Sequence, residues 1–145
     1  MRGLCLQDGP LGVRFADYVS VFPAGLTAAA TWDRSMIYAR ANALGKEHHD
    51  KGVDVLLGPV SGPIGRFANG GRNWEGFSPD PFLTGISMEE SVKGIQDAGV
   101  IACAKHFIGN EQGPFSLSIC LVQFCTFPDT RRTLSSSLRE HTARL

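Results

Sequence analysis

The sequence predicts an α/β protein built around a parallel sheet, and two observations carry this prediction. Short apolar runs alternate along the chain with amphipathic segments of helical length. The runs at 53–57 and 100–104 are almost continuously apolar, so we expect both faces of these strands to be covered. Strands of this kind pair in parallel, with helices packed outside them.

The first half of the chain predicts a strand, an extended segment, a helix and a second strand. The first strand is expected at 4–6 and the extended segment at 22–30. Asp33 is placed to cap a helix that runs to about His49 and stops at Gly52. The strand 53–57 follows. The apolar side of the helix is expected to be formed by Met36, Ile37, Ala41 and Leu44.

The second half predicts a long loop, a helix and a strand. Residues 58–81 are expected to be loop because Gly and Pro are frequent at its start. Ser87 and Glu90 have the spacing of a capping box for a second helix, which Gly99 would end. Its inner side would carry Val92, Ile95 and Ala98, and the strand 100–104 follows.

This order of elements leaves two architectures open, a (β/α)8 barrel and an open doubly wound sheet. A complete barrel takes about 200–250 residues. The chain has 145 residues, so it has room for about half of one.

Charge and composition exclude several classes of function. The chain carries 14 basic and 14 acidic residues, and this zero balance offers no broad electrostatic surface for nucleic acid or an anionic membrane. No apolar run reaches the roughly 18 residues of a membrane-spanning helix. The start of the chain also lacks the apolar core of a signal peptide.

The residue patterns suggest neither a metal nor an organic cofactor. The cysteines Cys5, Cys103, Cys120 and Cys125 form no CxxC pair and have no histidine at zinc-ligand spacing, so we expect four free or buried thiols. His48 and His49 do not form an HExxH motif and are expected to be solvated at the end of a helix. No glycine-rich nucleotide-binding motif is present.

Polar side chains follow three of the predicted strands, where the chemistry of α/β folds collects. Asp8 follows the first strand, Arg72 lies in the loop after the second, and Lys105 and His106 end the last. A carboxylate, two cations and an imidazole that converge suit a ligand rich in hydroxyl groups.

Each of these residues also has a structural interpretation. Asp8 could cap a turn, Arg72 could pair with Glu75, and Lys105-His106 could serve the fold alone. Two aromatic residues of the long loop, Trp74 and Phe77, could offer an apolar face to a sugar ring or form a wall of the pocket.

Five segments together resemble glycoside hydrolase family 3, in its fungal β-glucosidase branch. The likeness covers about residues 3–112 in unbroken order. The segments are Leu4–Arg14 (LCLQDGPLGVR), FPAG at 22–25 with ATWD at 30–33, GPV at 58–60, GRNWEGFSPDP at 71–81 and AKHFIGNEQ at 104–112.

The resemblance implies hydrolysis of terminal, non-reducing β-D-glucosyl residues with retention. It implies a (β/α)8 barrel followed by an α/β sandwich domain, so this chain is expected to be a partial (β/α)8 TIM-type barrel with about half of the barrel present. Asp8, Arg72, Lys105 and His106 would then bind the hydroxyl groups of one glucose ring. The resemblance also implies a secreted protein whose ligand is a small-molecule β-glucoside or cello-oligosaccharide.

The chain departs from the family pattern in its catalytic residues. The family's nucleophilic aspartate lies in a Ser-Asp-Trp type of motif, which these residues lack, and its acid/base comes from the second domain. No catalytic residue is therefore assigned. Residues 1–112 are expected to be the N-terminal part of the barrel domain, and 113–145 a tail outside the family that is disordered or mistranslated.

Two functions follow as expectations. One is a β-glucosidase-type hydrolase, here a part that keeps glucose-binding residues and is inactive alone because it lacks both catalytic carboxyl groups. The alternative is a non-catalytic carbohydrate-binding protein or a non-functional truncated product.

Overall fold

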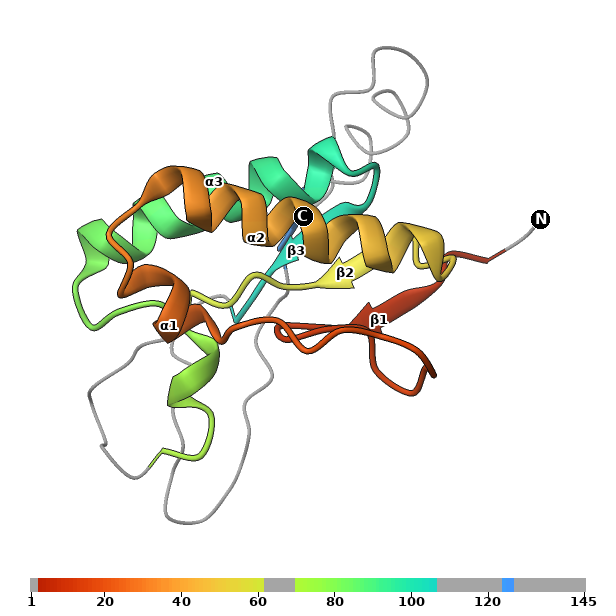
Figure 1. Cartoon of the computed structure of the whole chain (residues 1–145), viewed down its shortest axis with the longest axis horizontal. Helices are drawn as coiled ribbons and strands as arrows, with labels where there is room; N and C mark the ends of the chain where they lie inside the picture. The colour runs from red at the N-terminus through yellow and green to blue at the C-terminus, as the bar shows by residue number, and fades with distance from the viewer. Residues whose placement is uncertain (1–2, 62–69, 107–123, 127–145) are drawn as a thin grey trace, which may run out of the picture.

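The computed structural model describes residues 3–61 and 70–106, and the backbone of 124–126. Figure 1 shows the course of the chain. The elements in chain order are β1 (Leu6–Asp8), α1 (Gly25–Ala29), α2 (Arg34–Asp50), β2 (Val55–Leu57), the 3-10 helix η1 (Asn73–Glu75), α3 (Pro81–Asp97), β3 (Ile101–Ala104) and β4 (Phe124–Thr126).

The strands form one sheet in the order β1-β2-β3-β4. The first three strands pair in parallel, as the apolar runs predicted, and β4 pairs with β3 in the antiparallel direction. Contacts at Cys5 set the start of the parallel pairing. Its carbonyl accepts from the N–H groups of Asp54 and Val55, and its own N–H donates to the Asp54 carboxylate at 2.7 Å.

Helices α2 and α3 lie side by side and cover one face of the sheet (Figure 1). The parallel strands follow one another in sequence order, with no reversal between them. This arrangement is shared by a barrel segment and by one half of a doubly wound sheet, so the described residues establish a parallel α/β unit. The core between helices and sheet contains Ala41, Leu44, Leu56, Ile95, Val100 and Ala102.

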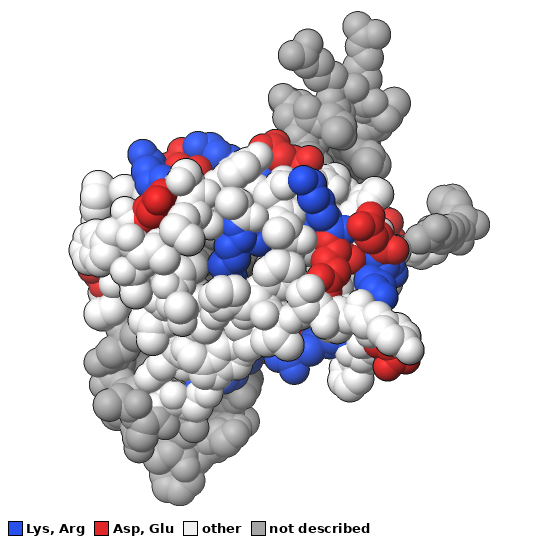
Figure 2. Space-filling model, in the orientation of Figure 1, with Lys and Arg blue, Asp and Glu red and all other residues white. Residues whose placement is uncertain are grey.

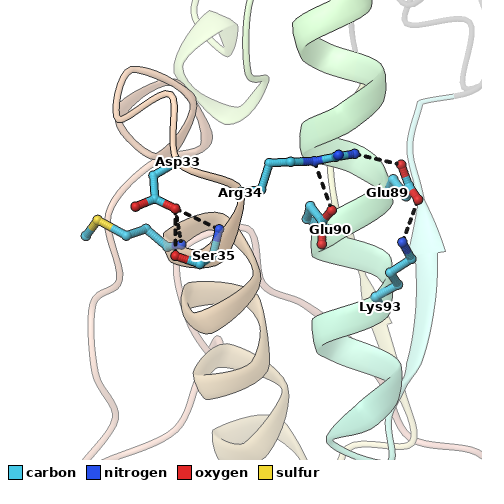
Figure 3. Close-up of polar contacts among 7 residues, drawn as sticks. Asp33, Arg34, Ser35, Glu89, Glu90 and Lys93 are labelled. Carbon is cyan, nitrogen blue, oxygen red and sulfur yellow. Dashed lines mark hydrogen bonds and ion pairs between the residues drawn. The ribbon is translucent and has the colours of Figure 1, made fainter.

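Helix α2 begins as predicted, at a cap formed by Asp33. The Asp33 carboxylate accepts hydrogen bonds from the N–H groups of Ser35 and Met36, which the first turn of a helix cannot satisfy internally (Figure 3). The helix ends just before Gly52, which has the positive φ of 79° expected of a stop. Met36 was wrongly assigned to the apolar side, because it lies 58% exposed near the exposed start of the helix.

The prediction that His48 is solvated was wrong, whereas His49 is exposed as expected. His48 is fully buried, and its Nδ1 lies 2.8 Å from the carbonyl oxygen of Leu44. The physical reason is helical periodicity: positions 37, 41, 44 and 48 share the face of α2 that is turned to the sheet. Within the described residues, its Nε2 has no hydrogen-bond partner.

Helix α3 begins seven residues earlier than the capping-box spacing predicted. Asp80 is the true cap, since its carboxylate accepts from the N–H groups of Phe82 and Leu83, and Pro81 occupies the first turn. Ser87 is instead buried in the middle of the helix. The predicted stop at Gly99 is confirmed by its φ of 86°.

The extended segment predicted at 22–30 was also wrong in part, because 25–29 form the helix α1. The single turn lies against the 3-10 helix. A side chain at Gly25 would collide with the carbonyl oxygens of Glu75 and Gly76. Tertiary packing thus overrides the weak extended pattern of this short segment.

The surface mixes charges of both signs. Figure 2 shows acidic and basic side chains intermingled over the helices, with no broad patch of one sign on this face. Arg34 at the start of α2 pairs with two residues in the middle of α3, Glu89 at 3.3 Å and Glu90 at 3.2 Å, and Lys93 also pairs with Glu89 (Figure 3).

The prediction of four thiols was wrong for Cys103, which is disulfide-bonded, while Cys5 is a free, exposed thiol. Cys103 is fully buried in β3, which pairs with β4. The side chains of Cys120 and Cys125 lie outside the described residues. Within the predicted tail 113–145, the structure describes only β4. The rest of the tail, with the disorder predicted for it, lies outside the described residues.

Candidate functional site at the carboxyl ends of the strands

Asp8 and Lys105 meet at the carboxyl ends of the parallel strands. Asp8 is the last residue of β1, and Lys105 directly follows β3. Both backbone polar groups of Lys105 are bonded to the segment that follows β2. Its N–H donates to the Pro59 carbonyl at 2.9 Å, and its carbonyl accepts from the Ser61 N–H at 2.6 Å. Its Nζ reaches across β2 and donates to Oδ1 of Asp8 at 2.9 Å.

This ion pair is exposed on one side only. The side chain of Lys105 is 3% exposed, whereas that of Asp8 is 58% exposed. The hydrogen bond from Lys105 is the main reason that the pKa of Asp8 lies below its ordinary value of 3.8; partial burial opposes it, and the charges of Lys105, Arg72 and Arg14 add to it. Asp8 is therefore an ionised acceptor, open to solvent, at neutral pH.

Arg72 lies beside this pair and is held by Glu75. Its Nε and Nη2 donate to the two carboxylate oxygens of Glu75 at 2.5 Å and 2.8 Å, a two-point pair of the strong type. Glu75 is buried, but the Arg72 side chain remains 57% exposed. The hydrogen bond with Glu75 is the main cause that raises the pKa of Arg72, and the charge of Asp8 contributes. The predicted loop ion pair exists, and it orients Arg72 without covering it.

His106 completes the group at the next position of the chain. Burial is the main cause that lowers its pKa, and the positive charges of Arg72 and Lys105 lower it further against the opposing effect of Glu75 and Asp8. His106 is thus neutral at pH 7, so its ring carries one donor and one acceptor nitrogen. The peptide bond between Lys105 and His106 is cis.

These four residues, predicted as a group from the sequence, act on one another electrostatically in the structure. A single cluster thus combines an ionised carboxylate, two cations and a neutral imidazole. Residues 7–116 match the Glycosyl hydrolase family 3 N terminal domain. The chain belongs to glycoside hydrolase family 3.

Relatives within glycoside hydrolase family 3 are similar over most of this chain. It is 64% identical over 115 residues to "Probable beta-glucosidase A" of Emericella nidulans, and 63% identical over 113 residues to "Beta-glucosidase 1" of Aspergillus aculeatus. These matches cover 79% and 78% of this chain and 13% of each relative. The chain thus spans about an eighth of the length of these relatives.

Solved structures of family members show the same backbone arrangement. The β-glucosidase of Chaetomium thermophilum is 68% identical, with a TM-score of 0.76 over 79% of this chain and 14% of that one. The β-glucosidase 3B of Thermotoga neapolitana, solved in complex with α-D-glucose, is 40% identical, with a TM-score of 0.68 over 74% of this chain and 16% of that one.

Sequence reasoning on this family 3 chain missed one charged neighbour of the cluster. Arg14 contributes to the low pKa of Asp8, although it lies six positions beyond it in an exposed loop. The signal was available, because Arg14 closes the first of the segments that carry the family resemblance.

The two aromatic residues proposed for a sugar face differ in position. Phe77 is 2% exposed and lies in the core, so its prediction as an apolar face for a sugar ring was wrong. Trp74 is partly exposed, and its indole N–H donates to the Gly71 carbonyl at 3.2 Å. Trp74 therefore stays a candidate platform for a sugar ring.

The described residues contain neither a metal-binding cluster nor a membrane-spanning helix. Within 3–61 and 70–106, no three histidine, cysteine, aspartate or glutamate side chains are grouped so that they could hold a metal ion. In the same residues, none of the helices has the length and apolar character needed to cross a membrane.

Proposed function

We propose that this family 3 chain carries the glucose-binding half of a β-glucosidase site, built on part of a (β/α)8 barrel. The observation that carries the proposal is the Lys105–Asp8 contact of 2.9 Å within the charge field of Arg72. The parallel, sequential strand order supports the barrel, and the family relatives support the activity.

The cluster offers the polar groups that one hexose ring needs. The Asp8 carboxylate can accept from two neighbouring hydroxyl groups, while Arg72 and Lys105 donate to hydroxyl oxygens. His106, being neutral, can do either. Bonds from charged groups are about twice as strong as neutral ones, which suits a site that holds a small, strongly hydrated ligand.

The reaction itself needs two further carboxyl groups. A retaining glycosidase uses one as nucleophile and one as acid/base, about 5–5.5 Å apart across the scissile bond. The resemblance assigns both to sequence beyond the segments matched here. The proposed role of Asp8, Arg72, Lys105 and His106 is therefore to bind and orient the ring, through bonds that strengthen as the oxocarbenium-like transition state forms.

Glucose titration of the 145-residue chain, followed by 1H–15N NMR, tests the binding. We expect saturable shifts that centre on Arg72, Lys105 and His106, and loss of these shifts in Asp8→Asn. The matched control is Arg34→Met, which removes an exposed charge that pairs with Glu89 and Glu90 and contacts none of the four cluster residues, so it should leave the shifts unchanged. Shifts that persist in Asp8→Asn would overturn the proposal, because glucose would then bind without Asp8. The absence of shifts in the folded wild-type chain would also overturn it and would favour a non-functional product.

An assay with an aryl β-glucoside tests whether this chain binds the sugar without hydrolysing the glycosidic bond. The chain alone is expected to bind without turnover, because loss of both catalytic carboxyl groups removes orders of magnitude in rate. Turnover that disappears in Asp8→Asn would show that catalytic groups lie within these residues.

We also infer an extracellular location, in agreement with the family resemblance. The disulfide of Cys103 supports it, since disulfides persist in oxidising compartments. Mass spectrometry of protein from culture medium and from cell lysate, without reduction, would test this: intact, oxidised protein confined to the lysate contradicts it.

A further inference from the structure

Side chains of α2 and its C-cap hold the loop between β1 and α1 by hydrogen bonds to main-chain groups of that loop. Arg40 donates from Nε to the Pro23 carbonyl at 2.6 Å and from Nη2 to the Pro10 carbonyl at 2.7 Å. Further along the helix, the Glu47 carboxylate accepts from the Ser20 N–H and the Lys51 ammonium donates to the Asp17 carbonyl. These three side chains are spaced by seven and four residues, so they lie along one side of α2, with Lys51 at its C-cap.

Arg40 closes the loop at its two ends. Pro10 lies at the start of the loop and Pro23 at its end. A backbone hydrogen bond of 2.7 Å, from the Phe22 N–H to the Leu11 carbonyl, also joins the two ends. Desolvation lowers the pKa of Arg40 to about 10, so the guanidinium is still charged at neutral pH. Ion pairs of the described residues do not include Arg40, so the two carbonyls are the acceptors that offset its burial.

Both residues that follow Asp8 are held from α2. Gly9 lies against the buried imidazole of His48, so closely that a side chain at this position would collide with it. Pro10 is held by Arg40. The cations whose charge acts on Asp8 are Lys105, Arg72 and Arg14, and Arg40 is not one of them. The contact through which Arg40 acts on the chain after Asp8 is therefore its hydrogen bond to the Pro10 carbonyl.

We propose that Arg40 is a positioning residue of the candidate site: through the carbonyls of Pro10 and Pro23 it sets how the chain leaves β1 after Asp8 and where the loop carries Arg14. The geometry favours arginine over lysine here. The two acceptors are reached by two different nitrogens of one rigid guanidinium, whereas a lysine ammonium is a single point at the end of a flexible stem.

The test compares Arg40→Met and Arg40→Lys with a matched control, Lys51→Met. The control removes a contact of the same kind, from side chain to loop carbonyl, at the far part of the loop. The first readout is the pKa of Asp8, followed by NMR of its carboxyl carbon. In Arg40→Met we expect this pKa to rise toward 3.8, because Asp8 loses its alignment with Lys105, and in Lys51→Met we expect it unchanged.

The second readout is glucose affinity, which rests on the proposed function. We expect it to weaken by roughly two- to tenfold in Arg40→Met, the range of one lost hydrogen bond, with a smaller loss in Arg40→Lys. The conservative core variant Ile37→Val separates positioning from general loss of stability, and it should leave the pKa of Asp8 unmoved.

The two readouts fail independently. If the wild-type chain binds no glucose but the pKa of Asp8 rises in the Arg40 variants, the proposed function fails and the positioning role stands. An unchanged pKa of Asp8 in folded Arg40→Lys and Arg40→Met overturns the positioning role. Should Arg40→Met not fold, Arg40→Lys decides, because it keeps the charge and can reach only one carbonyl at a time.

Discussion

The Lys105 ammonium lies 2.9 Å from the Asp8 carboxylate, although 97 residues separate the two in sequence. The parallel sheet makes this contact possible, because it brings the ends of β1 and β3 to one edge with a single strand between them. The two partners differ in exposure: Lys105 is buried and Asp8 is half open to solvent. Because of that difference, removing one partner should cost a different amount of stability from removing the other.

Removing the exposed partner should cost more stability than removing the buried one. Asp8→Ala leaves the buried Lys105 ammonium without its acceptor, and we expect a loss of about 1–3 kcal/mol in the free energy of unfolding. Lys105→Met replaces the ammonium by an apolar group, and the remaining Asp8 carboxylate is solvated, so its cost should be clearly smaller. Urea unfolding of both variants at neutral pH checks the order, and equal or reversed costs would refute this account of the pair.

Acid should break the ion pair between Asp8 and Lys105 by protonating the Asp8 carboxylate. The pKa of Asp8 is lowered in the folded chain, so the carboxylate stabilises the fold fully above its unfolded pKa of about 3.8. That contribution is lost as the pH falls through the lower, folded pKa. Asp8→Asn should therefore differ from wild type in unfolding free energy at pH 6 and approach it at about pH 2. A difference that does not shrink with acid would contradict the prediction.

His48 should make the chain less stable in mild acid. Burial is the main cause that lowers its pKa below 6.5, against the weaker opposing effects of the Leu44 carbonyl and the Glu47 charge. The unfolded chain therefore binds a proton before the folded chain does. Stability falls as the pH drops through 6.5 and levels off below the folded pKa.

Substitution of His48 by phenylalanine, a ring that does not titrate, should reduce this slope between pH 7 and 5 and leave the part that His106 contributes, because the pKa of His106 is also lowered. The matched control is His49→Gln, because His49 neighbours it on α2 but is exposed, and this variant should keep the wild-type slope. Thermal unfolding at several pH values measures both variants, and a slope that is as steep in a folded His48→Phe variant as in wild type would contradict the prediction.

Two glycines of α3 should respond to alanine in opposite directions. At Gly94 a side chain would lie 2.7 Å from the Tyr38 carbonyl oxygen and 2.8 Å from the Asn42 nitrogen, where α3 meets α2. Gly94→Ala should thus cost about 1–3 kcal/mol through overpacking. At Gly85 nothing lies within 4 Å, so Gly85→Ala should gain up to about 1 kcal/mol from helix propensity. Unfolding free energies check both, and a stable Gly94→Ala would refute the close approach.

Local signals were enough to predict much of the fold. The cap at Asp33, the stops at Gly52 and Gly99, and the two apolar strands were all predicted from neighbouring residues, and all are present. These features depend on the backbone hydrogen bonds and dihedral angles of one turn, which nearby side chains control.

The remaining features depend on contacts between distant segments. Sequence placed Asp8, Lys105 and His106 at the ends of strands and Arg72 in the following loop, but only the folded sheet joined Asp8 to Lys105 across 97 residues. Burial of His48 likewise follows from what packs against α2, whereas the early start of α3 follows from a local signal, the Asp80 cap before Pro81. A chain can encode its turns and caps locally, whereas burial and charge pairing exist only once remote parts of the backbone have been brought together, because both depend on excluding water.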